Sequence, residues 1–240
     1  MSALTCLAAL TFGAAYAQTA SDYSAILSAP DRSDADKQAD ARRDPTPLLV
    51  LAGVKPGMNV LDMGAGGGYS TELMARAVAP NGKVYGQNPS DVSDKQKAAF
   101  QARLAGPGGK DIIADTAPFD DPVPAGVSNL DLVTFLFYYH DTAYMSVDRA
   151  AMNRKLFAAL KPGGVLIVAD HSAQPGQGLT VVKTLHRIEE STERQEIEAA
   201  GFKFVAEGNF WRSAADTHDF PSYKPVVPVD NFVLKFERPK

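Results

Sequence analysis

Residues 60–69 read VLDMGAGGGY, a short apolar run that leads into a loop rich in glycine. The apolar run over residues 59–63 predicts a buried strand, and the one-sided apolar pattern of residues 70–79 predicts a helix. The alternating glycines of residues 64–68 therefore connect a strand to a helix. Glycine lets the backbone approach a ligand where a Cβ atom would collide with it. After the first strand of an open parallel sheet, such a connection is a typical ligand site.

Short apolar runs alternate with helical patterns along the rest of the chain. Further strands are expected at residues 83–87, 111–114, 130–137 and 165–169, with helices at residues 94–105, 148–160 and 191–200. This alternation predicts an α/β fold in which crossover helices join parallel strands. The end of the chain differs, because residues 202–207 and 231–237 form two strands with no helix between them. Such strands can pair antiparallel, so we expect a mostly parallel, doubly wound sheet with an antiparallel C-terminal strand.

The composition is that of an ordinary folded domain. Of the 240 residues, 45% are hydrophobic and 22% are charged, and a chain of this length can bury a sizeable core. The net charge is −4 and there is no long run of basic residues, which argues against electrostatic binding of nucleic acid. Cys6 is the only cysteine, which excludes a disulfide framework and a thiolate metal site.

The first residues have the pattern of a secretory signal peptide. Residues 4–15 are almost entirely apolar or small, and the run is too short to cross a bilayer as a helix. Ala15 and Ala17 have the spacing that suits signal peptidase, so residues 1–17 are expected to be cleaved after Ala17 and the protein to be periplasmic or secreted. No basic residue precedes the run, and a short N-terminal helix on a cytoplasmic protein is the alternative. Residues 18–44 are expected to be a polar linker leading into an N-terminal helix, and residues 45–240 one domain.

The glycine loop resembles the first motif of class I S-adenosylmethionine-dependent methyltransferases. It follows the pattern D-x-G-x-G-x-G, whereas the dinucleotide pattern G-x-G-x-x-G would need glycine at Tyr69. Residues 161–164, Lys-Pro-Gly-Gly, are similar to a later loop of the family, and the C-terminal strand pair matches its seven-stranded Rossmann-like sheet. The resemblance extends over about residues 45–240. It implies methyl transfer from S-adenosylmethionine to an unidentified acceptor, with a small molecule expected.

Within that family the chain looks most like a group of predicted bacterial methyltransferases that carry signal peptides. Three segments carry this closer likeness: residues 137–141, 185–188 and 230–236. The motif Asn/Asp-Pro-Pro-Tyr, common among enzymes that methylate nucleobase amines, does not follow the fourth expected strand. A nucleic-acid substrate is therefore not expected, and the sequence predicts neither a membrane span nor an oligomeric state.

The resemblance also implies which residues bind the cofactor. The expected set is Asp62, Gly64, Ala65, Gly66, Gly68, Asn88, Asp115 and Thr116. The glycines would let the loop pass under the methionine and ribose, and Asp62 would orient the loop or meet the amino group through water. Asp115 would accept a hydrogen bond from the adenine amine. Asn88 stands where the family usually has an acid for the ribose hydroxyls, and an amide lacks the charge-assisted strength of a carboxylate, so modest affinity is expected.

Several residues are candidates for chemistry with the acceptor. His140 follows the central fourth strand and is the best candidate for a general base, with a strand cap as the alternative role. Tyr138 and Tyr139 could line the sulfonium of the cofactor or a substrate ring. His171 ends the fifth strand, facing the expected cleft, and Arg187 could meet an acidic substrate unless it lies on a surface helix.

No metal site is predicted, because Asp141, Asp170 and His171 could hold a divalent cation only if they converge in space. Two other functions compete with methyl transfer. A nicotinamide-dependent oxidoreductase is disfavoured by Tyr69 and by the antiparallel end of the sheet. A ligand-binding protein that has lost catalysis is supported by Asn88, and also by the expected export, since S-adenosylmethionine is made in the cytoplasm.

Overall fold

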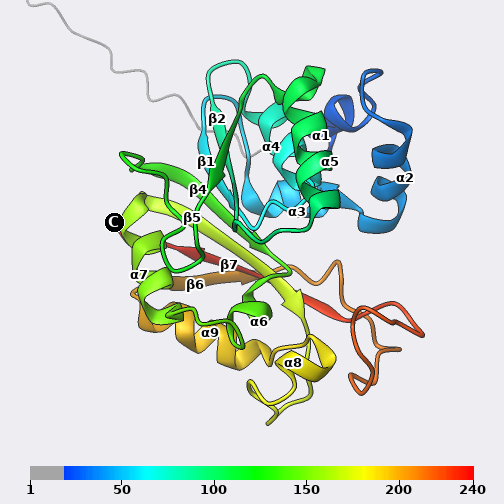
Figure 1. Cartoon of the computed structure of the whole chain (residues 1–240), viewed down its shortest axis with the longest axis vertical. Helices are drawn as coiled ribbons and strands as arrows, with labels where there is room; N and C mark the ends of the chain where they lie inside the picture. The colour runs from blue at the N-terminus through cyan, green and yellow to red at the C-terminus, as the bar shows by residue number, and fades with distance from the viewer. Residues whose placement is uncertain (1–18) are drawn as a thin grey trace, which may run out of the picture.

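A computed structural model describes residues 19–240 (Figure 1). The expected signal peptide and its cleavage site after Ala17 lie outside the described residues. Seven strands form one sheet in the order β3-β2-β1-β4-β5-β7-β6. The pairs among β1 to β5 are parallel, and β7 runs antiparallel to both β5 and β6. The predicted fold class is therefore confirmed.

The strands are β1 (Asn59–Met63), β2 (Lys83–Asn88), β3 (Ile112–Thr116), β4 (Leu130–Leu136), β5 (Leu160–His171), β6 (Lys203–Glu207) and β7 (Asn231–Glu237). The helices are α1 (Ala20–Leu27), α2 (Asp34–Arg43), α3 (Pro45–Ala52), α4 (Tyr69–Val78), α5 (Asp94–Ala105), α6 (Tyr139–Thr142), α7 (Arg149–Ala159), α8 (Val182–Leu185) and α9 (Glu190–Ala199), with a 3₁₀ turn at Pro107–Gly109. None of the helices described is long and apolar enough to cross a bilayer.

The sheet separates two hydrophobic cores because successive side chains of a strand point to opposite faces. On β1, Val60 packs with residues of α1, α3, α4 and α5, whereas Leu61 packs with residues of α6, α7 and α9. Figure 1 shows these two helix groups, one above and one below the sheet. Both cores leave the carboxyl ends of the parallel strands at a common edge, where the expected cofactor residues lie.

The structure differs from the expected linker at residues 18–44, because α1 and α2 are part of the packed fold. Tyr23 is fully buried, and its hydroxyl lies 3.0 Å from the Leu49 carbonyl and 2.7 Å from the Val54 carbonyl. Arg103 of α5 forms ion pairs with Asp36 of α2 at 2.7 Å and with Glu72 of α4 at 2.6 Å. Polar residues of this segment therefore form partly buried ion pairs with the rest of the fold, and the segment is not a solvated linker.

The first strand residues of β5 also differ from the sequence expectation. The sequence predicts a loop at the Lys-Pro-Gly-Gly segment, but β5 begins at Leu160 and includes this segment. Leu160 pairs with Leu130 across an irregularity in the ladder, and regular pairing resumes between Val165 and Leu132. Gly163 has φ +77°, a left-handed conformation that glycine adopts without strain. The segment is therefore a turn-like start of the strand.

We expect Tyr23→Phe to lower the free energy of unfolding by about 1–3 kcal/mol, because two buried carbonyl groups lose a shared donor. Chemical denaturation monitored by circular dichroism measures this loss. Tyr223→Phe is the matched control, since that tyrosine is 58% exposed, and its stability should stay at the wild-type value. Equal stability of Tyr23→Phe and the wild type would contradict an integral role for α1.

Candidate functional site

The loop between β1 and α4 requires glycine at the positions that the motif contains. Gly64, Gly66 and Gly68 have φ values of +67°, +57° and +81°, a region that residues with a Cβ atom rarely adopt. A Cβ on Gly64 would lie 2.9 Å from the ring of Tyr138, and one on Gly68 would lie 2.7 Å from the ring of Phe100. The loop therefore presents bare backbone at the carboxyl edge of the sheet.

Two neighbouring amide side chains at the end of β2 hold this loop in place. The Oε1 of Gln87 accepts a hydrogen bond from the Gly64 N–H at 3.0 Å, and its Nε2 donates to the Ala117 carbonyl at 2.6 Å. The Oδ1 of Asn88 accepts from the Gly66 N–H at 2.7 Å, and its Nδ2 donates to the Gly66 carbonyl at 3.1 Å. Asn88, expected to bind the ribose, is thus engaged with the loop. Sequence reasoning missed Gln87, whose only signal is a polar residue late in an apolar strand.

Asp62 is buried directly before the glycine loop. Its carboxylate accepts hydrogen bonds from the Thr71 hydroxyl at 2.6 Å and the Thr134 hydroxyl at 2.7 Å. Burial raises the pKa of Asp62 to about 6, against the two hydroxyl bonds, which lower it. Asp62 thus joins β1 to both α4 and β4 directly before the glycine loop. It also borders the cavity that Gly64 to Gly67 line.

A cavity of about 330 Å³ lies at the ends of β2 and β3. Asn88, Asp115 and Thr116 border it, as expected for residues that surround one part of a cofactor. The Oδ2 atom of Asp115 is buried and has no hydrogen-bond partner among the described residues. Burial raises the pKa of Asp115, against one backbone hydrogen bond that lowers it. A buried acceptor without a donor is rare in folded proteins, so this atom fits an external N–H donor such as the adenine amine.

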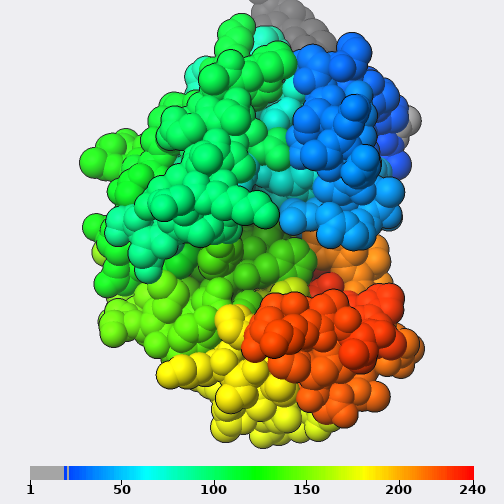
Figure 2. Space-filling view, turned by 45° about the vertical axis from the view of Figure 1, so that its right-hand side comes forward, coloured from blue at the N-terminus to red at the C-terminus, as the bar shows by residue number. Residues whose placement is uncertain are grey.

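A larger cavity of about 650 Å³ borders the glycine loop directly, since Gly64 to Gly67 line it. In Figure 2, the blue segment that includes α2 and α3 lies above the loop of residues 208–230 (orange to red). Arg42, Arg43 and residues of α3 border the cavity from the first of these segments, and Trp211 borders it from the second. Much of its wall is apolar or aromatic, including Leu48, Leu49, Met74, Phe137, Tyr138 and Trp211. The Nε1 of Trp211 donates to the Arg43 carbonyl at 2.7 Å, which links the two bordering segments.

His171 borders this larger cavity in a defined tautomer. Its Nδ1 lies 2.6 Å from the Oδ1 of Asn231, whose Nδ2 donates to the Val229 carbonyl at 3.2 Å. Because the amide oxygen of Asn231 faces the ring, Nδ1 must carry the proton, and Nε2 keeps a lone pair. Burial lowers the pKa of His171, against the nearby Asp170 charge, which raises it. The ring also stacks on Phe137 with centroids 5.0 Å apart.

His140, expected as the general base, does not border the larger cavity. It is 2% exposed, and its Nδ1 lies 2.6 Å from Asp170 while its Nε2 lies 3.0 Å from Asp141. Burial lowers the pKa of His140, but the two carboxylates outweigh it and raise the pKa to about 10. Both ring nitrogens of His140 therefore face carboxylates, whereas His171 borders the cavity and is the better placed of the two histidines to act as a base.

The other expected substrate residues divide between the cavity and the core. Tyr138 borders the cavity, and its hydroxyl accepts a hydrogen bond from Gln96 at 3.0 Å. Tyr139 points to the opposite side, where its hydroxyl donates to Glu196 at 2.8 Å. Arg187 is fully buried and forms an ion pair with Asp216 at 2.9 Å. The expectation that Arg187 meets a substrate is therefore wrong, because its guanidinium has no access to the cavity.

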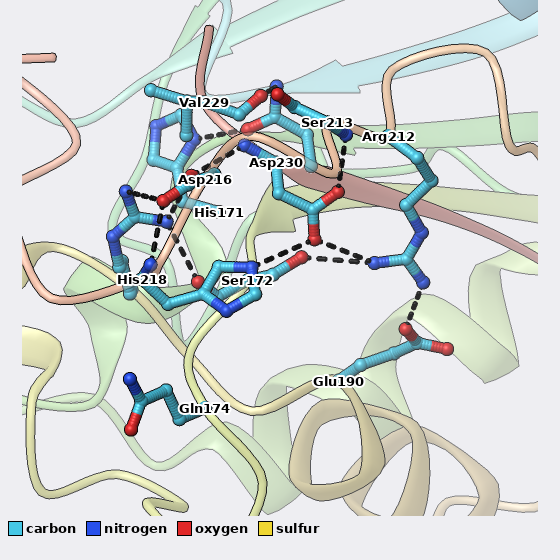
Figure 3. Close-up of polar contacts among 12 residues, drawn as sticks. His171, Ser172, Gln174, Glu190, Arg212, Ser213, Asp216, His218, Val229 and Asp230 are labelled. Carbon is cyan, nitrogen blue, oxygen red and sulfur yellow. Dashed lines mark hydrogen bonds and ion pairs between the residues drawn. The ribbon is translucent and has the colours of Figure 1, made fainter. Parts of the chain in front are cut away.

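The loop of residues 208–230 is fixed by a polar network at the end of β5. Figure 3 shows Arg212 reaching both Glu190 of α9 and Asp230, with His218 on the other side of the same carboxylate. Asp230 also accepts from the Ser213 N–H at 2.8 Å. These contacts give the wall that carries Trp211 a fixed position.

The sequence suggests a cation site only if Asp141, Asp170 and His171 converge, and in the structure they do not. Asp170 directs its carboxylate to the ring and backbone N–H of His140. His171 binds Asn231 instead.

We expect the stability difference between Asp62→Asn and the wild type to depend on pH. Asp62 has an ordinary pKa of 3.8 and a raised pKa of about 6 in the fold, so between these values the folded state binds more protons than the unfolded state. The wild type then loses stability as the pH rises from 4 to 6, on the order of 2–3 kcal/mol. The asparagine variant lacks this loss, and urea unfolding at several pH values should show it gaining on the wild type. A pH-independent difference would contradict the burial of a carboxylate here.

Comparison with known proteins agrees with this geometry. Residues 54–213 match the family described as "Methyltransferase domain". The chain is 30% identical over 131 residues to the ubiquinone/menaquinone biosynthesis C-methyltransferase UbiE of Ectopseudomonas mendocina, covering 55% of this chain and 48% of that protein. Identity to UbiE of Shewanella baltica is 24% over 162 residues, or 66% of this chain and 62% of that protein. The chain thus spans about half to three fifths of these relatives.

Solved structures share the fold at low sequence identity. A SAM-dependent methyltransferase from Aquifex aeolicus superimposes with a TM-score of 0.60 at 19% identity, covering 86% of this chain and 99% of that chain. Aeropyrum pernix fibrillarin, solved with natively bound S-adenosyl-L-methionine, gives a TM-score of 0.52 at 16% identity, covering 76% and 67%. The match over residues 54–213, together with this fold, shows that the chain belongs to the methyltransferase domain family.

Proposed function

We propose that this protein transfers a methyl group from S-adenosylmethionine to a small-molecule acceptor. The observation that carries the proposal is Asp115, which borders the cavity at the ends of β2 and β3 and whose buried Oδ2 has no hydrogen-bond partner among the described residues. Beside it, the glycine loop leaves backbone open to a ligand, as cofactor binding at this sheet edge requires. The membership of the methyltransferase domain family and the structural neighbours named for S-adenosylmethionine support the same cofactor.

The residues of the chain fit the cofactor in two regions. Asp115 would accept a hydrogen bond from the adenine amine, and Gly64 to Gly68 would lie against the ribose and methionine parts. Asn88 already makes two hydrogen bonds with Gly66, so it would have to exchange one of them to reach a ribose hydroxyl. This competition supports affinity in the micromolar range. When bound, S-adenosylmethionine supplies a methyl group already activated by its sulfonium, so alignment can provide most of the catalysis.

The larger cavity supports an apolar or aromatic acceptor. Phe137, Tyr138 and Trp211 border it, and aromatic side chains favour planar ligands through offset or edge contacts. Arg42 and Arg43 also border the cavity and would favour an acceptor that carries an acidic group. The names of the curated relatives assign them C-methylation in ubiquinone and menaquinone biosynthesis. A small aromatic compound is therefore the proposed class of acceptor.

His171 is the proposed proton acceptor during transfer. A carbon or hydroxyl acceptor must lose a proton, and a base within reach of that proton accelerates the step. His171 borders the cavity with Nδ1 bound to Asn231, which leaves Nε2 as the accepting atom. Tyr138 lies on the same cavity and would help to orient the acceptor ring.

A protein that binds ligand without turnover is the second candidate. The observation that favours it is that the Asn88 amide is hydrogen-bonded to Gly66 of the glycine loop, where the family usually has a carboxylate for the ribose. Both candidates require binding at Asp115, and only the first requires His171. Binding and turnover measurements therefore separate them.

We expect the full chain to bind S-adenosylmethionine with a Kd in the micromolar range, about −8 kcal/mol. Asp115→Ala should weaken binding about tenfold, because one hydrogen bond to the adenine amine is lost. Isothermal titration calorimetry measures both values, with NADH as a ligand control. Asp121→Ala is the matched control in the segment that follows β3, since that side chain is 66% exposed. A folded protein that ignores S-adenosylmethionine would overturn the proposal.

We expect His171→Ala to reduce turnover about 10²–10⁴-fold while the affinity for S-adenosylmethionine is kept, because a positioned base contributes roughly that factor. Release of S-adenosylhomocysteine in the presence of small phenols and quinols measures turnover. Added imidazole should partly restore the activity of His171→Ala. Turnover equal to the wild type would remove His171 from the mechanism, and binding without turnover in the wild type would favour the second candidate.

A further inference from the structure

Three potential metal ligands meet on the side of β4 and β5 that carries α6. The Nε2 of His140 lies 3.0 Å from the Oδ1 of Asp141, and the Nδ1 of His186 lies 3.2 Å from the same oxygen. The two ring nitrogens are 3.3 Å apart. The three atoms therefore form a nearly equilateral triangle, although His186 is 46 positions from His140 in the sequence.

We propose that His140, Asp141 and His186 bind a divalent transition-metal ion of the zinc type. Bonds of about 2.0–2.1 Å in tetrahedral geometry separate neighbouring ligand atoms by roughly 3.3–3.4 Å, close to the three edges given above. Two imidazoles and one carboxylate suit zinc and its neighbours in the first transition row, whereas magnesium and calcium prefer oxygen ligands alone. Without a cation, a single carboxylate oxygen would have to satisfy both rings and the Tyr144 hydroxyl, which lies 2.6 Å away.

Asp170 supplies the outer support that such a site needs. It is fully buried, and its Oδ1 lies 2.6 Å from the Nδ1 of His140 while its Oδ2 accepts from the backbone N–H of His140 at 2.8 Å. This pair of bonds fixes the ring so that Nε2 faces Asp141 and His186. A carboxylate behind a ligating histidine is the usual arrangement at protein metal sites, where it fixes the tautomer and raises the basicity of the ligand.

His186 gives the site its access to solvent. Its side chain is 33% exposed, and its backbone adopts φ +49° at the end of α8. A non-glycine residue in this region is uncommon, and here the conformation turns the imidazole toward Asp141. Tyr144 and Tyr223 flank the ring with centroids 5.8 Å and 5.0 Å away. Three protein ligands beside an exposed edge leave a fourth position for water or another small ligand.

The site is distinct from the proposed methyl-transfer cavity but lies next to it. The ring of His140 lies 5.6 Å from the ring of His171, which borders that cavity. None of the three ligands borders the cavity itself. A bound ion would hold α6 to the turn after α8 and would thereby support the position of His171. Binding of the metal ion at this site does not depend on cofactor binding.

The test is a zinc titration of the full chain after dialysis against a chelator. We expect one equivalent of Zn²⁺ to bind and to raise the Tm, because an ion that binds the folded state stabilises it. Co²⁺ in the same protein should give the visible absorption of a four-coordinate site. His186→Ala should remove the tight equivalent and the absorption, and it should fold, because His186 is partly exposed. Asp170→Asn should weaken binding about 10–100-fold.

His218→Ala is the matched control, since that histidine is also partly exposed and paired with Asp230. It should bind Zn²⁺ like the wild type, and so should Asp115→Ala, which separates this proposal from the proposed cofactor site. No tight equivalent in the wild type would overturn the metal site. Binding that survives in His186→Ala with an unchanged Co²⁺ spectrum would also overturn it, because the ion would then lie elsewhere.

Discussion

The amide side chains of Gln87 and Asn88 bind the glycine loop to the end of β2, and the walls of both cavities include residues of this attachment. These two adjacent residues make four hydrogen bonds, which fix Gly64 and Gly66 of the loop and Ala117, the first residue after β3. The smaller cavity lies at the ends of β2 and β3 and is bordered by Asn88 and by Asp115, whose buried Oδ2 has no hydrogen-bond partner among the described residues. The larger cavity is bordered by the loop itself and by aromatic residues.

The ends of β4 and β5 form a second organising point around Asp170. Its carboxylate accepts bonds from the His140 ring, the His140 backbone and the His171 backbone. Because successive side chains of a strand point to opposite faces of the sheet, the side chains of Asp170 and His171 lie on opposite faces. One face has the histidine and aspartate cluster around Asp141, and the other has the proposed base in the larger cavity. His140 therefore belongs to the cluster around Asp141, and His171 takes the role of the base that the sequence predicts at His140.

Much of the fold follows from the sequence because its signals are local. The strands at residues 59–63 and 231–237 have the predicted bounds, since apolar runs or alternation and flanking turn residues define them. The glycine loop is equally readable, because its left-handed backbone needs glycine. The helices of residues 20–43 were not anticipated in full, since their stability comes from Tyr23 and from ion pairs with distant residues.

The site was less predictable because its chemistry depends on contacts between distant residues. Nothing near Asn88 in the sequence indicates that its amide is used by Gly66, 22 positions away. The raised pKa of His140 comes from Asp170 as well as from its neighbour Asp141. Arg187 is a surface candidate by composition and a buried ion pair in the fold, since Asp216 and Phe220 lie in a loop that only tertiary structure brings beside it.

A crystal structure of the full chain grown with S-adenosylmethionine tests the function most directly. We expect the adenine amine within hydrogen-bond distance of Asp115, the methionine part against Gly64 to Gly68, and the methyl group facing the cavity of about 650 Å³. A ligand bound elsewhere, or an adenine that makes no contact with Asp115, would contradict the proposed function.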